Sequence, residues 1–407
     1  MTGRTPARGG GCLRLLLTAL LAFGWLLAAP PAQAQADAPR IGVATMAPGE
    51  IFFERFGHNA IVVADPRTGA ATAYNFGFFD PTEPDFLTRF VEGRMRYRLA
   101  ALPFAEDLAY YRQVGRGVTV QWLDLTPDQA RELAQALRIN ALPQNAHYDY
   151  QYFDDNCATR VRDALDRALD GALKRQTAGR SHGNTYRGEA LRLSRPVWWM
   201  WLGFDLGLGP AADAPRSVWE DAFVPMRLAD ALAETRTAAG GPLVVATERV
   251  LPHRLAPEPG ERPIRWMPWA AAGVALAAAL LLAARRAPRA LGAFALVWWT
   301  LCTLIGATLL FLWVGTEHRY AWANRNLLLF LPLCALLLPA AWRRLRARAP
   351  RRWERTALTV VAGIAALALF FYWLPKVPQQ NLHWIVLTLP VHAALALAWP
   401  RAARRTG

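Results

Sequence analysis

Five apolar runs occupy the last third of the chain and constrain its fold more than any other feature. They cover residues 266–284, 290–314, 327–342, 356–374 and 382–400. A helix needs about 20 apolar residues to cross the hydrocarbon core of a bilayer, and most of these runs reach that length. The third run is shorter and contains Pro332 and Pro339, which interrupt helical hydrogen bonding. The sequence therefore predicts an all-α membrane domain of about five transmembrane helices over residues 266–407.

The basic residues of the chain indicate how these helices are oriented. Clusters of arginine follow the first, third and fifth runs, and loops rich in Arg and Lys stay on the cytoplasmic side of a membrane. The formal net charge is +15, and its excess lies in these loops and in the N-terminal segment. The basic charge thus reflects membrane topology, so it gives no support for a nucleic-acid partner. The same orientation predicts that residues 37–262 lie outside the cytoplasm.

The first 36 residues have the organisation of an export signal peptide. A basic segment at residues 4–14 precedes an apolar segment at residues 15–29, and small residues suited to cleavage follow at 32–36. The alternative is that this segment is not cleaved and remains as an N-terminal membrane anchor. Residues 37–237 then form a predicted exported domain, and residues 238–265, rich in Pro, Gly and charge, a linker to the membrane domain.

Residues 58–64 and 71–78 form a predicted β-hairpin in the exported domain. The first run is rich in β-branched residues, and residues 65–69 between the runs are typical of a turn. Because side chains two residues apart share a face of a strand, Asn75 is expected on the same face as His58, one pair removed.

The rest of the exported domain mixes helical and strand patterns. We expect helices at residues 84–96, 103–113 and 126–140, and strands at 97–101 and 117–125. Thr126 and Gln129 match a capping box, and Pro127 suits the first helical turn between them. The predicted fold class is an α+β exported domain followed by an all-α membrane domain.

Cys157 stands at the predicted start of a helix and is the candidate nucleophile. Asp154, Asp155 or Asn156 can cap this helix, because a side-chain oxygen accepts from a free N–H of the first turn. A thiol there lies near the positive end of the helix dipole, which favours the thiolate. A buried structural cysteine is the alternative interpretation.

The distribution of cysteine favours the catalytic interpretation. Of the four cysteines, Cys12 lies in the signal segment, and Cys302 and Cys334 lie in apolar runs. Cys157 is therefore the lone cysteine of the exported domain, where no disulfide can form. An unpaired thiol in an oxidising compartment is expected to be either buried or used.

A cysteine nucleophile needs a base and a group that orients the base. His58 is the predicted base and Asn75 the predicted orienting group, since both lie on one face of the hairpin. His147 and His182 lie in loop-like stretches and are weaker candidates. No metal-ligand spacing, phosphate loop or dinucleotide motif stands out, so the sequence predicts no metal or other cofactor.

Two loops of the membrane domain are expected at the outer bilayer surface. Residues 315–326 contain His318, Arg319, Asn324 and Asn326, which form a predicted binding site for a lipid phosphate or headgroup. Ordinary interfacial anchoring is the alternative. The tryptophans at positions 198, 199 and 201 are typical either of a core corner or of a patch that rests on the bilayer.

The order of the His58 strand and the Asn156-Cys157 helix start resembles the permuted NlpC/P60-like thiol enzymes, including the lecithin–retinol acyltransferase group. Five segments more closely resemble the Lnb family of bacterial lipoprotein N-acyltransferases. These are Phe56-Gly57-His58, Tyr74-Asn75-Phe76-Gly77, Tyr152-Phe153-Asp154-Asp155-Asn156-Cys157-Ala158-Thr159, Trp219-Glu220-Asp221-Ala222-Phe223-Val224-Pro225 and Asn324-Arg325-Asn326-Leu327-Leu328.

The resemblance implies an acyltransferase of the bacterial inner membrane with a catalytic domain in the periplasm. Its acyl donor would be a phospholipid, its intermediate a thioester at Cys157, and its acceptor the N-terminal amine of a lipoprotein. Asn156 joins the substrate-binding set, and the Cys157 backbone N–H is a candidate donor to the oxyanion. Two alternatives stay open: a thiol hydrolase acting on peptidoglycan peptides or phospholipid esters, and a non-enzymatic envelope protein.

Overall fold

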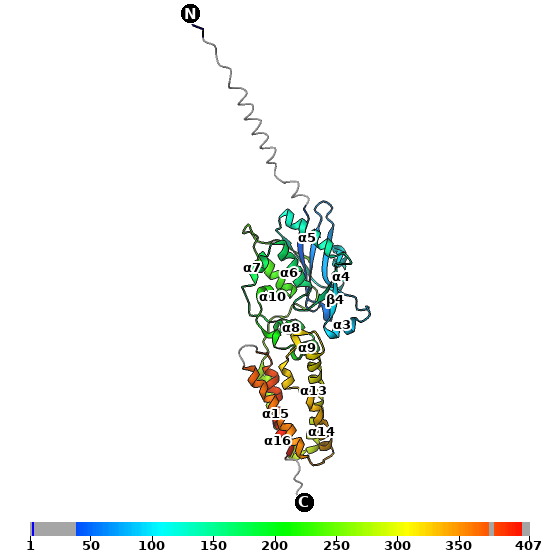
Figure 1. Cartoon of the computed structure of the whole chain (residues 1–407), viewed down its shortest axis with the longest axis vertical. Coiled ribbons are helices and arrows are strands. Elements are labelled where there is room, and N and C mark those ends of the chain that lie inside the picture. The colour runs from blue at the N-terminus through cyan, green and yellow to red at the C-terminus, as the bar shows by residue number, and fades with distance from the viewer. Residues whose placement is uncertain (1, 4–37, 374–377, 401–407) are drawn as a thin grey trace.

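The computed structural model describes residues 2–3, 38–373 and 378–400 (Figure 1). The predicted signal peptide lies almost entirely outside these ranges. A domain of strands and helices and a bundle of long helices lie end to end, with α8 (Tyr186–Ser194) and α9 (Trp198–Gly207) at their junction (Figure 1). The predicted order, a mixed exported domain followed by an all-α membrane domain, is confirmed.

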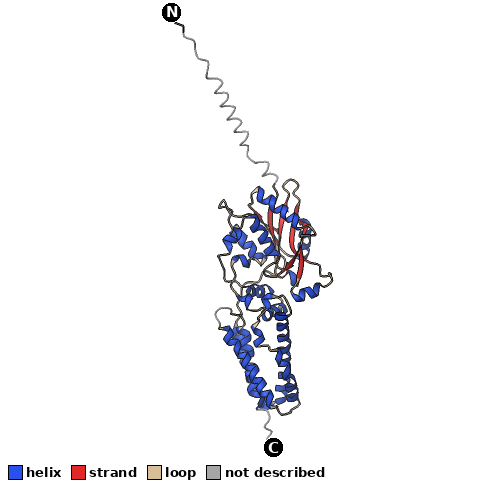
Figure 2. Ribbon diagram, in the orientation of Figure 1, coloured by secondary structure: helices blue, strands red, loops and turns tan. Residues whose placement is uncertain are grey.

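A seven-stranded sheet forms the centre of the N-terminal domain (Figure 2). Its spatial order is β6-β4-β3-β2-β1-β5-β7, and every neighbouring pair is antiparallel. The strands are β1 (Arg40–Met46), β2 (His58–Ala64), β3 (Ala71–Phe78), β4 (Met95–Pro103), β5 (Val118–Leu123), β6 (His147–Tyr150) and β7 (Val244–Leu251).

The hairpin of β2 and β3 has the predicted bounds and positions the site. Ala60 pairs with Asn75, so His58 and Asn75 point to one face of the sheet. The Pro66–Gly69 turn region closes through a hydrogen bond from the Asp65 N–H to the Ala70 carbonyl, 2.8 Å long. Beyond Asn75, the register of β3 against β4 shifts at a bulge that extends to Phe78.

Helices cover both faces of the sheet. On one face, α5 (Pro127–Asn140), α6 (Cys157–Ala168) and α11 (Pro225–Glu234) pack against large side chains such as Ile61 and Tyr74. On the other face, α4 (Phe104–Val114) packs over small residues such as Ala60 and Ala73. Shorter elements complete the domain: η1 (Phe52–Glu54), α3 (Phe86–Glu92), α7 (Ala172–Thr177), η2 (Pro210–Asp213) and α10 (Val218–Asp221).

The start of α5 confirms the predicted capping box. The Thr126 hydroxyl accepts from the Gln129 N–H at 3.2 Å, and the Gln129 side chain accepts from the Thr126 N–H at 3.0 Å. Two of the N–H groups at the helix start thereby gain partners from local sequence alone.

Strand β7 lies inside the segment predicted as a linker. It pairs with β5 at the edge of the sheet, and most of its residues are exposed. A strand that buries little apolar surface has no strong hydrophobic pattern, and its hydrogen bonds come from a partner over a hundred residues earlier in the chain. The segment therefore carries the last strand of the N-terminal domain before it reaches the membrane domain.

The membrane domain consists of α12 (Trp266–Arg286), α13 (Pro288–Val314), η3 (Arg319–Ala321), η4 (Arg325–Leu328), η5 (Pro332–Leu337), α14 (Leu338–Leu345), α15 (Arg352–Tyr372) and α16 (Leu382–Ala398). Among the described residues, four helical segments are long and apolar enough to cross a membrane, and α16 is a shorter apolar helix. The long segments are Trp266–Arg286, Pro288–Val314, Arg319–Leu345 and Arg352–Tyr372.

The third apolar segment is not one continuous α-helix. It is built from the 3₁₀ turns η3, η4 and η5 before α14 begins, and prolines stand at the starts of η5 and α14. The broken segment packs closely on α13, where a Cβ at Gly306 would lie 2.0 Å from the Phe330 carbonyl oxygen. The irregular backbone near Phe330 is thus packed directly against the backbone of α13.

Candidate active site

Cys157 is the first residue of α6, and the turn before it is held by hydrogen bonds. Gln151 and Asp155 exchange backbone hydrogen bonds of 3.0 and 2.9 Å, which closes the turn between β6 and α6. Asn156 is the N-cap, and its side chain accepts from the Thr159 N–H at 3.0 Å. Of the three predicted capping residues, Asn156 is the one that caps the helix.

The amide of Asn156 is fully engaged by the protein. Its Nδ2 donates to the carbonyls of Tyr152 at 3.0 Å and Phe223 at 2.9 Å, and the residue is buried. These contacts tie the helix start to the loop around Phe223. Asn156 therefore positions Cys157 in this structure, and a contact with substrate stays a prediction.

The thiol of Cys157 lies where the bulge interrupts β3. The last β2–β3 pair is Ala60 with Asn75, and the Asn59 N–H beyond it donates to the sulfur. Gly77, at φ +87°, faces the cysteine, and a Cβ on Gly77 would lie 3.6 Å from the Cys157 Cβ. Gly77 thus places backbone in a left-handed conformation, and no side chain, against the cysteine at the bulge.

Burial raises the pKa of the Cys157 thiol above its ordinary value. The N–H groups of Asn59, Ala158 and Cys157 itself and the charge of Arg116 act in the opposite direction, but burial has the larger effect. The helix start thus favours the thiolate, as the sequence predicts, without being sufficient to form it in the resting protein. A base must remove the thiol proton during attack.

His58, Asn75 and Asp107 form a hydrogen-bonded chain beside the thiol. His58 Nε2 lies 3.0 Å from Asn75 Oδ1, and Asn75 Nδ2 donates to Asp107 Oδ2 at 2.7 Å. Because Asp107 accepts from the amide nitrogen, the amide oxygen must face His58, and Nε2 must carry a proton. The neutral imidazole then has its lone pair on Nδ1, where it can accept a proton.

The surroundings of His58 keep the imidazole neutral. Burial lowers the pKa of His58 to about 4, although the hydrogen bond that the imidazole donates to Asn75 raises it, and the charge of Arg116 lowers it further. Arg116 is buried, forms an ion pair of 3.2 Å with Glu54 and donates to the Ala47 carbonyl at 2.8 Å. A neutral imidazole is ready to act as a base at neutral pH.

Cys157 and His58 both adjoin the backbone of Asn59. The sulfur accepts from the N–H of Asn59, the residue that follows His58 in β2. The contacts among the described residues include no direct hydrogen bond from Cys157 to the imidazole. Contacts of this kind are commonly long in a free enzyme and shorten when substrate binds.

Asp107 is the member of this site that the sequence reasoning missed. It lies on α4, where Phe104 and Tyr111 lie on the same face at positions −3 and +4 and are buried against the sheet. An acidic residue on the apolar face of a predicted helix was the available signal. Burial raises the pKa of Asp107, while the hydrogen bond from Asn75 lowers it.

Replacement of Asp107 by Ala is expected to reduce turnover by roughly 100-fold, because the Asn75 amide can then rotate and select the wrong imidazole tautomer. Asp107→Asn is expected to retain most of the activity, since an amide oxygen still accepts from Asn75. Steady-state kinetics on both variants, with Glu106→Ala as a neighbouring control on α4, measure this difference. Equal losses in the Ala and Asn variants would contradict a positioning role.

The loop that follows α13 contacts the residues just before Cys157. His318 Nδ1 lies 3.1 Å from the Tyr152 hydroxyl, and the Tyr320 hydroxyl donates to Asp154 Oδ1 at 2.7 Å. His318 is half-buried, and Arg319 beside it is exposed. The outer loop of the membrane domain thus supports the turn that carries the candidate nucleophile.

Two glycines allow the N-terminal domain to approach this outer loop closely. A Cβ at Gly93 would lie 2.9 Å from the His318 nitrogen, and a Cβ at Gly209 would lie 2.2 Å from the Trp322 carbonyl oxygen. The Glu317 N–H donates to the Glu92 carbonyl at 2.7 Å next to the first of these contacts.

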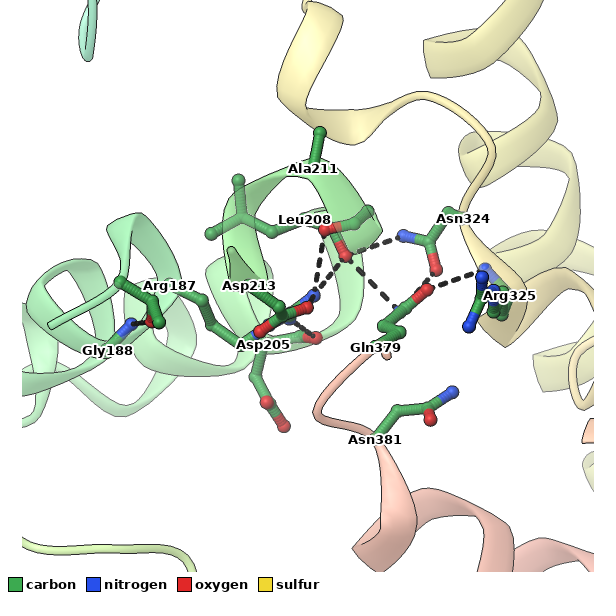
Figure 3. Close-up of polar contacts among 12 residues, drawn as sticks. Arg187, Gly188, Asp205, Leu208, Ala211, Asp213, Asn324, Arg325, Gln379 and Asn381 are labelled. Atoms are coloured by element: carbon green, nitrogen blue, oxygen red, sulfur yellow. Dashed lines mark hydrogen bonds and ion pairs between the residues drawn. The ribbon is translucent and has the colours of Figure 1, made fainter. Parts of the chain in front are cut away.

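Asn324 and Asn326 are buried. Figure 3 shows Asn324 next to Leu208 and Gln379, at the junction between the domains. Asn324 Nδ2 donates to the carbonyls of residues 206, 207 and 208 at 2.7, 3.0 and 3.2 Å, which satisfies the end of α9. Asn326 donates to the Leu206 carbonyl at 3.2 Å and accepts from Asn381 at 2.9 Å. Both side chains bond within the chain, and their contact with a lipid stays a prediction.

The other histidines of the N-terminal domain that the sequence singled out, His147 and His182, are exposed. Within residues 38–373 and 378–400, no group of three His, Cys, Asp or Glu side chains is arranged to hold a metal ion. The candidate site therefore consists of Cys157 at the start of α6 and the hydrogen-bonded chain of His58, Asn75 and Asp107.

Comparison with protein families agrees with this architecture. Residues 28–188 match the Lnb N-terminal periplasmic domain, and residues 265–401 match the Lnb transmembrane domain. No curated protein and no solved structure matches the chain. The first match contains Cys157, His58 and Asn75, and the second contains the outer loop that contacts the turn before Cys157. The chain belongs to the Lnb family, as a membrane protein with a periplasmic N-terminal domain.

Proposed function

We propose that this protein is a membrane-bound thiol acyltransferase. It moves a fatty acyl chain from a phospholipid to the N-terminal amine of a lipoprotein, through a thioester at Cys157. The catalytic domain then works on the periplasmic side of the bacterial inner membrane. The observation that carries the proposal is the position of Cys157: at a capped helix start, beside a neutral His58 oriented by Asn75, and supported by the outer loop of the membrane domain.

In the first half-reaction, Cys157 Sγ attacks the ester carbonyl of the phospholipid. His58 Nδ1 takes the thiol proton as the C–S bond forms, and it returns the proton to the glycerol oxygen as the C–O bond breaks. A lysophospholipid leaves and the acyl chain remains on the sulfur. The N–H groups of Asn59 and Ala158, which face the sulfur, are candidate donors to the oxyanion along with the Cys157 N–H.

In the second half-reaction, the neutral amine of the lipoprotein attacks the thioester carbonyl. The C–N bond forms, the C–S bond breaks, and the amine proton passes through His58 to the sulfur. An α-amino group has an ordinary pKa near 7.7 to 8.0, so a useful fraction is unprotonated at neutral pH. The products are an amide and the regenerated thiol, and no redox cofactor is required.

The contact between the nucleophile turn and the membrane domain supports a lipid substrate over a soluble one. Tyr152 and Asp154 bond to His318 and Tyr320, which follow the end of α13 by only a few residues. A donor phospholipid and a lipid-anchored acceptor both have their reactive groups at this level of the bilayer. In this proposal, His318 and Arg319 contact the headgroup, while Asn156, Asn324 and Asn326 hold the surrounding backbone.

Mass spectrometry of a purified reaction tests the proposal. The full chain is placed in nanodiscs with a phospholipid that carries an isotope-labelled acyl chain, and a diacylated lipopeptide with a free N-terminal amine is added. We expect the peptide to gain the mass of one labelled chain and lysophospholipid to appear in equal amount. Release of labelled free fatty acid alone would instead identify a hydrolase, and the absence of both products would contradict thiol catalysis on phospholipid.

A further inference from the structure

An exposed apolar surface lies beside the candidate active site, next to the membrane domain. It is formed by η1, α3 and α9, and its most exposed members include Leu87, 71% exposed, and Trp198, 74% exposed. Phe53 and Trp199 are also more than half exposed. A contiguous apolar surface of this kind on a folded domain indicates a binding surface. Exposure of Trp198 and Trp199 agrees with the bilayer alternative for this tryptophan cluster.

Aromatic rings form a continuous row from this surface toward the interior. Each ring lies within 6.3 Å of the next, measured between centroids, and from Phe90 inward the spacing shortens from 6.3 to 4.5 Å. In order, the members of the row are Trp199, Phe52, Phe90, Phe86, Phe79, Tyr97 and Tyr150. We call these seven residues the aromatic row. They come from six separate elements or turns, so the fold assembles the row.

The inner end of the aromatic row reaches the nucleophile. A Cβ built on Gly77 would lie 3.6 Å from the Tyr150 ring and 3.6 Å from the Cys157 Cβ. The bulge at Gly77 therefore separates the last ring from Cys157 by the space of one small group. An acyl chain attached to the sulfur would meet this ring first.

The outer end of the aromatic row lies at the level of the bilayer surface. The Glu92 carbonyl, in the last residue of α3, accepts from the N–H of Glu317, three residues beyond the end of α13. Figure 1 shows α3 and α9 next to the outer ends of the long helices. Leu87 and Val91 are exposed on α3 at this level, where an apolar helix face is buried in the headgroup and acyl boundary.

We propose that the apolar surface of η1, α3 and α9 is immersed in the outer leaflet and that the aromatic row guides the acyl chain of a donor phospholipid to Cys157. The guiding role of the aromatic row rests on the proposed function, whereas immersion of the apolar surface does not. We assign the aromatic row to the acyl chain of the donor. This acyl chain becomes bonded to the sulfur and must extend away from it, and the inner end of the row lies beside the sulfur. Contact of Leu87 with lipid follows from position alone.

Immersion is measured with a fluorescent label in nanodiscs that contain phospholipids brominated on the acyl chain. Leu87→Cys is labelled in a full chain that also carries Cys12→Ser and Cys157→Ser, in which Cys302 and Cys334 are buried. The matched control is Ile139→Cys on α5, a residue that is half exposed. Helix α5 lies at the end of the domain away from the long helices (Figure 1). We expect strong quenching at position 87 and none at 139, and equal quenching at both would overturn immersion.

The guiding role is measured by the dependence of the rate on acyl-chain length. Phe79 stands in the middle of the row, 5.5 Å from Phe86 and 4.9 Å from Tyr97. We expect Phe79→Ser to lower the kcat/KM ratio of a long-chain to a short-chain donor by about tenfold, because it removes one apolar side chain from the path. Phe79→Leu is expected to restore most of this ratio, and Ile139→Ser should leave it unaltered.

The two measurements separate the failures of the two proposals. An unaltered chain-length ratio in an active Phe79→Ser variant would overturn the guiding role, although acyl transfer itself would stand. A wild-type protein without transfer activity would contradict the proposed function, and quenching at position 87 would still establish immersion.

Discussion

Replacement of Cys157 by Ser is expected to reduce acyl transfer by about 10³-fold or more while the fold persists. The serine hydroxyl is close in size to the thiol, so the N-cap by Asn156 and the contact with the Asn59 N–H are retained. Its far higher pKa removes the reactivity, since His58 must then deprotonate an alcohol. The measurement is the rate of amide formation on the lipopeptide, together with a search for the acyl-enzyme by mass spectrometry of the intact protein.

A second cysteine supplies the matched control for this loss. Cys302 is buried in α13, and Cys302→Ala should retain transfer because its sulfur lies in the membrane domain. Circular dichroism and the unfolding midpoint of both variants confirm that the fold is intact. Undiminished transfer by a stable Cys157→Ser protein would exclude the thioester route.

Replacement of His58 by Ala is expected to lower kcat/KM by about 10²- to 10⁴-fold, the usual contribution of a positioned general base. Removal of the base is expected to cost more activity here than in an enzyme whose cysteine is already ionised. Burial raises the pKa of the Cys157 thiol, so its proton must be removed during attack. Steady-state kinetics with His182→Ala, an exposed histidine in the same domain, is the comparison. Equal kinetics for wild-type and His58→Ala protein would remove His58 from the site.

The pH dependence of the wild-type protein identifies His58 in a second way. Its pKa of about 4 in the fold lies below the ordinary 6.5, so the base stays unprotonated until the pH approaches 4. The acid limb of kcat/KM is therefore expected near pH 4 rather than near 6.5. In the unfolded chain His58 has its ordinary pKa, so on acidification it binds a proton before the folded protein does. The stability contributed by neutral His58 is therefore present above pH 6.5 and decreases as the pH falls toward 4.

Local sequence patterns predict the parts of the site that depend on neighbours in the chain. The turn residues between β2 and β3 and the two-residue period of the strands are sufficient to align His58 with Asn75. The capping residues around Thr126 and Asn156 similarly define the starts of α5 and α6. Each of these features depends on a few residues that are close together in the chain.

Features that depend on distant partners are not visible in local patterns. Asp107 completes the chain to His58 because α4 crosses the sheet above β3, a packing that no helical period specifies. Strand β7 exists because β5 offers it an edge, despite a polar and exposed sequence. The engagement of Asn324 with the end of α9 likewise joins residues more than a hundred positions apart.

The close contacts at Gly93 and Gly209 have a consequence for substrate selection. With no room for a side-chain carbon at either position, the outer loop holds the N-terminal domain in close contact with the membrane domain. The Cys157 thiol is then held at one depth, so it can react only with bonds at that depth. Phospholipid ester carbonyls occupy a narrow layer below the headgroups, so in the proposed reaction we expect the protein to select esters by their depth in the bilayer.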